Sequence, residues 1–221
     1  MIPAFLTTPA ALTVAFALAL IGLALAILAD HFQVIAKYLG SQKQRIAGGY
    51  NLAMKVMVVN RLGAVLYFLL IAFNIDNGLE PEVLVLGLAL TVASIAVPTI
   101  GILFWLQRRL KEQSSEFRVL DVSQWPTTIV IATFFATLLN LLGLTVPWIA
   151  SATYPELRLT LANTSFLFNT LFTVINVFYI EHRLAKIVDE GAEQIHGFVA
   201  GVIVARLIAF IAVGVGLVVV F

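Results

Sequence analysis

The chain has 221 residues, of which 61% are hydrophobic and 11% are charged, and its net charge is +1. The mean hydropathy of +1.03 and the low charge content exclude a soluble globular domain, in which about a quarter of residues are charged. The near-neutral charge gives no indication of nucleic-acid binding, and the lack of cysteine excludes disulfides and thiolate metal sites. We expect an all-α polytopic membrane protein with a single transmembrane domain over residues 1–221.

Six apolar segments are each long enough to cross a bilayer core about 30 Å thick. No basic residues precede the first of them, so we do not interpret it as a cleaved signal peptide. Pro98 predicts a kink in the third span, and Trp148 marks the membrane interface at the end of the fourth. The six expected helices cover residues 8–28, 47–74, 81–106, 126–149, 155–180 and 195–221.

The connections between these spans differ in basic content. The connection after the second span has no lysine or arginine, and the one after the fourth has only Arg158. Because cytoplasmic loops are enriched in basic residues, we expect the odd-numbered connections in the cytoplasm and both termini outside. The basic residues of the odd-numbered connections are Lys37, Lys43, Arg45, Arg108, Arg109, Lys111, Arg118, Arg183 and Lys186.

Two arginines fall deep within predicted spans. If the second span enters lipid near Gly49, Arg61 lies about 18 Å in, close to mid-depth, and Arg206 lies at a similar depth. Lys55 is nearer the cytoplasmic edge. We expect no acidic residue at this depth, since Asp30 and Glu181 fall at predicted cytoplasmic helix ends. An unpaired buried charge is costly, so the arginines need a bound anion, or water and amide groups, as partners.

Asparagine and threonine form polar stripes on two of the spans. Residues four and three apart share a helix face, so Asn140 follows Thr133 and Thr137 along one stripe. These stripes fit either interhelical hydrogen bonds or ligand contacts. The candidate binding residues are Lys55, Asn60, Arg61, Asn140, Asn169, Thr173, Asn176 and Arg206.

Structural roles are open alternatives for the cations. Arg61 and Arg206 can cap backbone carbonyls or reach Asp30 and Glu181, and Lys55 can extend its ammonium to the interface. The sequence contains no nucleophile–base set, carboxylate pair, phosphate-binding glycine loop or His-Glu-x-x-His motif. We therefore expect no enzymatic activity, no cofactor and no metal site.

Several segments, in order along the chain, carry a resemblance to one family. These segments are Arg45–Ala47, Asn60–Ala64, Tyr154–Thr160, the Ser/Asn-rich Asn163–Thr173, Val188–Glu190 and a final helix containing Arg206. In these segments and their order, the chain resembles the Amj-type lipid II flippases, the alternate to MurJ.

This resemblance implies a multi-pass protein of the bacterial cytoplasmic membrane that acts in peptidoglycan synthesis and cell wall biogenesis. Its substrate would be undecaprenyl-pyrophosphate-linked precursor, moved to the outer leaflet. Arg61 and Arg206 would then neutralise the pyrophosphate, with Lys55 assisting. The expected partners are this anionic lipid and membrane lipids, and not nucleic acid. The alternatives are an anion channel or transporter, and a non-transporting assembly protein that binds anionic lipid; an enzyme acting on lipid-linked sugars is disfavoured because deep carboxylates are not expected.

Overall fold

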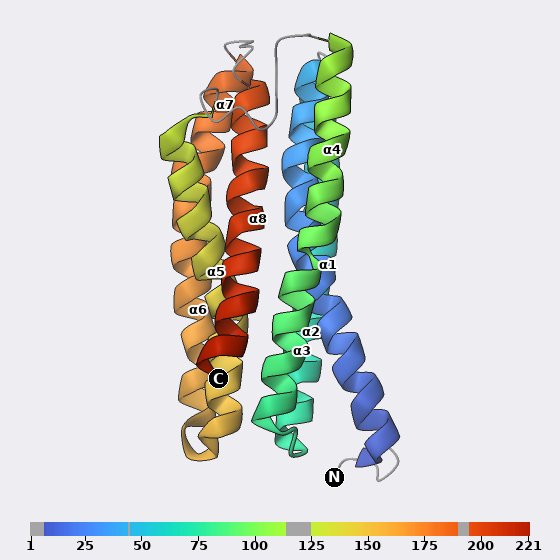
Figure 1. Ribbon diagram of the computed structural model, residues 1–221, viewed down its shortest axis with the longest axis vertical. Helices are drawn as coiled ribbons and strands as arrows, with labels where there is room; N and C mark the ends of the chain where they lie inside the picture. Colours follow the sequence, from blue (N-terminus) through green and yellow to red (C-terminus); the bar gives the residue numbers. More distant parts are fainter. Residues whose placement is uncertain (1–6, 44, 114–124, 190–194) are drawn as a thin grey trace.

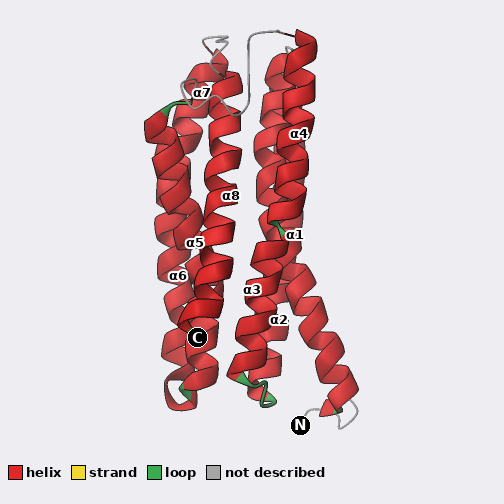
Figure 2. Cartoon of the chain, viewed as in Figure 1, coloured by secondary structure: helices red, strands yellow, loops and turns green. Residues whose placement is uncertain are grey.

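The computed structural model describes residues 7–43, 45–113, 125–189 and 195–221. Within these ranges the chain is 94% helical and has no strand (Figure 2). Six helical segments are long and apolar enough to cross a membrane. The prediction of an all-α, six-span, multi-pass membrane protein is therefore confirmed.

The helices follow the predicted order with changed boundaries. The elements are α1 (Pro9–Gln42), α2 (Ile46–Asp76), α3 (Pro81–Ser94), α4 (Ala96–Gln113), α5 (Thr127–Thr153), α6 (Arg158–Ile175), α7 (His182–Asp189) and α8 (Ile195–Val220). A short 3-10 turn, Pro155–Leu157, precedes α6, and a π-helix, η4 (Asn176–Glu181), follows it. Arg118 and residues 190–194, which include the end of the Val188–Glu190 segment, lie outside the described residues.

The helices form two groups side by side, α1 to α4 in one and α5 to α8 in the other (Figure 1). The start of α1 and the end of α8 lie at the same end of the bundle, as an even number of spans requires. The connection between α1 and α2, the end of α4 and the start of α8 lie at the opposite end. The basic, odd-numbered connections therefore join helices at this end of the bundle.

The first helix is longer than predicted. Residues 8–28 were expected as helix and Asp30 as the start of a polar connection, but α1 continues to Gln42. The apolar side chains that continue it, Val34 and Tyr38, are one turn apart and both buried, so packing extends the helix past the charge. Asp30 is consequently inside the first span, which corrects the expectation that no acid lies at depth.

Two other spans depart from regular α-helix. The third is interrupted at Ile95, between α3 and α4. Pro98 has no N–H to donate to the Ser94 carbonyl, so the expected kink is confirmed at this point. The fifth span passes through the π-helix η4, which the sequence did not predict, and continues as α7 beyond the expected end at residue 180.

Glycines bring α1 and α2 into backbone contact. A Cβ added at Gly63 would lie 2.8 Å from the Gly22 carbonyl oxygen, and one at Gly40 would lie 2.5 Å from the Gly49 Cα. Neither position has room for a side chain, so α1 and α2 pack closely in the way that small residues permit in membranes. The two helices thus form one stiff hairpin.

A polar layer separates two apolar clusters along the bundle. The first cluster contains Leu23, Tyr67, Leu84, Leu141 and Phe210. The second contains Tyr38, Leu106, Ile180, Phe198 and Ile203. Between them along α1, α4, α5 and α8 lie buried or partly buried polar residues, namely Asp30, His31, Thr99, Thr137 and Arg206.

Candidate functional site

A cavity of about 490 Å³, lined by polar and apolar side chains, lies at the level of this polar layer, between α1 and α2 of one group and α5, α6 and η4 of the other. Six of the eight predicted binding residues line it, although they come from four separate elements. These six are Asn60, Arg61, Asn140, Asn169, Thr173 and Asn176.

Arg61 lines this cavity. Gly63 packs against α1, and Arg61 lies two residues earlier, about 200° around the helix, so it is on the face of α2 that is turned away from α1. The residue is exposed, and no ion pair or hydrogen bond joins its side chain to another described residue. A cationic residue without a partner among the described residues therefore lines a cavity between apolar helices.

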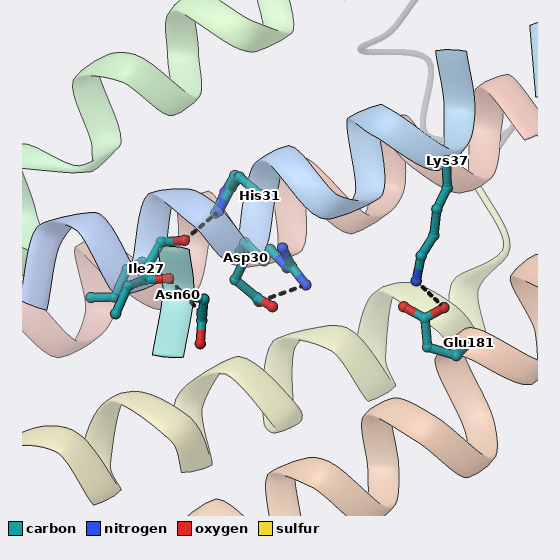
Figure 3. A network of polar contacts seen from close by, with 8 residues as sticks. Ile27, Asp30, His31, Lys37, Asn60 and Glu181 are labelled. Atoms are coloured by element: carbon teal, nitrogen blue, oxygen red, sulfur yellow. Dashed lines mark hydrogen bonds and ion pairs between the residues drawn. The ribbon is translucent and has the colours of Figure 1, made fainter. Parts of the chain in front are cut away.

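Asn60 holds the neighbouring position. Its side-chain amide donates to the Ala26 carbonyl of α1 at 2.7 Å, which fixes the α2 backbone on which Arg61 stands (Figure 3). Ala26 and Asn60 both line the cavity. Asn60 therefore positions the wall of the site, and its amide oxygen is left to accept from a ligand.

Arg206 is not exposed to the cavity. Its guanidinium on α8 is only 3% exposed, and Nη2 donates to Asp30 Oδ2 at 2.9 Å. The dashed line from Asp30 in Figure 3 marks this ion pair. The expectation that the deep cations lack an acidic partner is thus wrong for Arg206, for which the open alternative of a contact with Asp30 is observed.

Of the two residues in this ion pair, Asp30 lines the cavity and Arg206 does not. Its carboxylate thus lies between the cavity and the Arg206 guanidinium. The remaining Arg206 nitrogens, Nε and Nη1, are buried without a hydrogen-bond partner in the described part of the chain. The sequence analysis named Asp30 as an alternative partner of Arg206 but did not predict it in the cavity lining, because it placed the residue at the end of the first helix.

Amide groups cover the opposite wall. Asn140 comes from α5, Asn169 from α6, and Asn176 from the first residue of η4. No hydrogen bond joins these three side chains to other described residues, whereas the Thr173 hydroxyl donates to the Asn169 carbonyl of its own helix at 2.7 Å. The interhelical hydrogen bonds considered for the polar stripes are therefore not observed at these residues. The amides are free to bind a ligand.

The π-helix lies at the edge of the cavity. Its wider turn begins at Asn176, and π-helical turns are frequent at functional sites. Thr170 and Gln33 also line the cavity, and both were missed. Thr170 adjoins the predicted stripe at Asn169, while Gln33 follows Asp30 by one turn and was missed for the same reason, the premature end of the first helix.

Lys55 lies outside the cavity. Its side chain is exposed on α2, and it is not among the lining residues. Two further ion pairs join the helix groups beyond the cavity: Lys37 with Glu181 toward the basic end, and Arg158 with Asp76 toward the other end. The helix groups thus meet through a charged contact on either side of the cavity.

The side chains of the lining differ in charge and hydrogen-bonding capacity. The lining offers one free guanidinium, one carboxylate already paired, and several amides and hydroxyls. Over the described ranges, no three acidic or histidine side chains gather as a metal site would require. This set of donors suits a polyanionic, hydrogen-bonding ligand. Comparison with family models, with curated proteins and with solved structures finds no match to this chain.

Proposed function

We propose that this protein is a flippase of the bacterial cytoplasmic membrane that moves an anionic, lipid-linked headgroup to the outer leaflet. The observation that carries the proposal is the exposed Arg61 guanidinium, which lacks a partner among the described residues and lines an amide-rich cavity inside the membrane. A cation at this depth is costly unless a ligand or water satisfies it.

The donor set favours a phosphorylated ligand. A guanidinium binds phosphate through two parallel hydrogen bonds. The amides of Asn140, Asn169 and Asn176 can both donate and accept, as sugar hydroxyls and peptide groups require. A polyprenyl-pyrophosphate-linked sugar peptide, the peptidoglycan precursor named by the sequence resemblance, contains all of these groups.

The rim of the cavity favours a ligand with a lipid tail. Phe166 lines the cavity and is 78% exposed. Leu62, next to Arg61 on α2, is 65% exposed. In a membrane these apolar side chains face acyl chains. A headgroup can therefore occupy the cavity while its polyprenyl tail stays in lipid beside α2 and α6.

The orientation and the movement follow from the charges at the two ends. With the basic connections in the cytoplasm, the Lys37–Glu181 pair lies on the cytoplasmic side and the Arg158–Asp76 pair on the outer side. Rocking of one helix group against the other would break one pair while keeping the other, which exposes the cavity to each side in turn.

Complementation tests this function. A bacterial host depleted of its own lipid II flippases would express wild type, Arg61→Gln, or Arg45→Gln at matched membrane levels. Arg45 is the control because it is exposed at the start of the same helix and outside the cavity. We expect rescue by wild type and R45Q only.

Two results would contradict the proposal. Full rescue by R61Q would remove Arg61 from the transport path. Failure of a correctly inserted wild-type protein to rescue would exclude the lipid-linked precursor, and ionic current through planar bilayers would then indicate an anion channel.

A further inference from the structure

We propose that the lipid-linked headgroup leaves the Arg61 cavity through a second cavity further along the same helices, and that the rings of Phe68 and Trp148 form the barrier between the two. This inference rests on the proposed function and adds to it a second position for the headgroup, near the end of the bundle opposite the basic connections.

The second cavity, which we call the outer cavity, has a volume of about 400 Å³ and lies between α2, α5 and α6. Its lining continues that of the Arg61 cavity by about one turn on each of these helices. The two cavities are therefore successive spaces in one gap between the helix groups. The residues that line the Arg61 cavity and the outer cavity on successive turns are Phe68 and Ala72 on α2, Leu144 and Trp148 on α5, and Phe166 and Ala162 on α6.

Two aromatic rings separate the cavities. Phe68 lines the Arg61 cavity and Trp148 lines the outer cavity, and their ring centroids are 5.8 Å apart. Tyr67 is fully buried beside both rings, and its hydroxyl donates to the Leu144 carbonyl oxygen, which joins α2 to α5 at this level. A headgroup that moves from one cavity to the other must therefore displace the Phe68 ring or the Trp148 ring.

The two rings can be displaced without breaking a hydrogen bond to the described residues. Trp148 Nε1 is buried and has no hydrogen-bond partner among them, and the phenyl ring of Phe68 has no polar atom. Displacement therefore costs the contact between the rings and their apolar packing. A barrier of this kind holds a headgroup in place and still lets it pass.

The two cavities differ in charge. Arg61 is the charge without a described partner in the first cavity, because the carboxylate that lines it is already paired. In the outer cavity Asp76 is paired with Arg158, and Glu156 has no ion pair with a described residue. An anionic headgroup is therefore attracted in the first cavity and repelled in the outer one, so the outer cavity suits release.

The rate of exchange between leaflets tests the barrier. Phosphatidylcholine vesicles that contain the full chain and a fluorescent short-chain polyprenyl diphosphate sugar are treated with an impermeant quencher, and the slow phase of quenching gives the exchange rate. For Trp148→Leu, which removes one ring, we expect exchange about two- to tenfold faster, the range to which one aromatic pair corresponds. The affinity for this probe in lipid discs should not change, because Trp148 does not line the Arg61 cavity.

Trp105→Leu is the matched control. Trp105 is on α4, is partly buried like Trp148, and lines neither cavity. We expect the wild-type exchange rate in W105L. Equal acceleration in both variants would show a general loosening of the helices and would overturn the barrier.

Thiol protection tests the outer cavity without changing either ring. The chain contains no cysteine, so Ala64→Cys, Ala72→Cys and Glu80→Cys each introduce a single thiol. Ala64 lines the Arg61 cavity and Ala72 the outer cavity, whereas Glu80 is exposed in the turn after α2 and lines neither. In lipid discs we expect the probe to slow the reaction of A64C and, less strongly, of A72C with a charged thiol reagent, and to leave that of E80C unchanged.

The outcomes separate this inference from the proposed function. Protection of A64C alone, or an unchanged exchange rate in W148L, overturns the outer route and leaves the proposed function intact. No binding of the probe by wild type, or binding unchanged in R61Q, overturns the anionic ligand and the route together.

Discussion

Arg61 and Arg206 occupy the same polar layer but have opposite surroundings. Arg206 is buried on α8 and paired with Asp30, whereas Arg61 is exposed on α2 and has no partner among the described residues. Depth in the membrane therefore does not distinguish a structural arginine from a binding one. What distinguishes the two arginines is whether the protein supplies a counter-ion, and we propose that the unpaired Arg61 is the one that binds a ligand.

Removing Arg206 should have the largest effect on stability. Arg206→Met leaves the Asp30 carboxylate without its counter-ion, and breaking a buried pair from one side costs about 3 kcal/mol or more. Unfolding in mixed detergent micelles measures the loss, and the double variant with Asp30→Asn should recover much of it. A single R206M variant as stable as wild type would show that the pair contributes nothing to the fold.

Enlarging Gly63 should disturb the surroundings of Arg61, because both residues are on α2. Gly63→Val places a side chain where a Cβ already lies 2.8 Å from the Gly22 carbonyl oxygen, so the helices must separate, at a cost of about 1–3 kcal/mol. Arg61 moves with α2, so anion binding falls as well. Gly101→Val is the control, because its Cβ would meet no atom within 4 Å; equal losses in both variants would refute the close-contact explanation.

Replacing Arg61 conservatively should affect binding alone. Arg61→Lys keeps the charge but loses the bidentate hydrogen bonding of a guanidinium to phosphate. We therefore expect about tenfold weaker binding of a fluorescent short-chain polyprenyl diphosphate sugar in lipid discs. Stability should stay within about 0.5 kcal/mol of wild type, since Arg61 has no partner to lose among the described residues. Unchanged affinity in R61K would mean that only the charge of Arg61 matters.

The smallest loss of stability is expected from breaking the Arg158–Asp76 pair. Its side chains are 33% and 61% exposed, and exposed ion pairs contribute about 0–1 kcal/mol. Arg158→Met should therefore lower the free energy of unfolding by less than about 1 kcal/mol in the assay used for R206M. A loss as large as that of R206M would contradict the distinction between buried and exposed pairs.

Sequence patterns were sufficient for the spans and for part of the cavity lining. Hydrophobic length predicted six membrane helices, and the spacing of Asn169, Thr173 and Asn176 predicted a shared face, which lines the cavity. Both are local properties of one helix, and for this reason they can be read from the chain.

The pairing of Arg206 required tertiary information. A span of about twenty residues was enough for the bilayer, so α1 was ended before Asp30 although its apolar face continues to Tyr38. The contact itself joins the first and last spans, and no local pattern indicates which helices meet. The π-helix at Asn176 likewise has no sequence signal that we can identify.

The ion pair between α1 and α8 also sets an order of assembly. Asp30 is on α1, which is synthesised before α8 with its Arg206, so their contact can form only after α8 has entered the membrane. A product that stops before α8 leaves a carboxylate in the membrane without its counter-ion. Membrane proteases and chaperones act on incompletely folded chains. The unpaired Asp30 carboxylate would distinguish such a chain from the complete protein, in which Arg206 pairs with it.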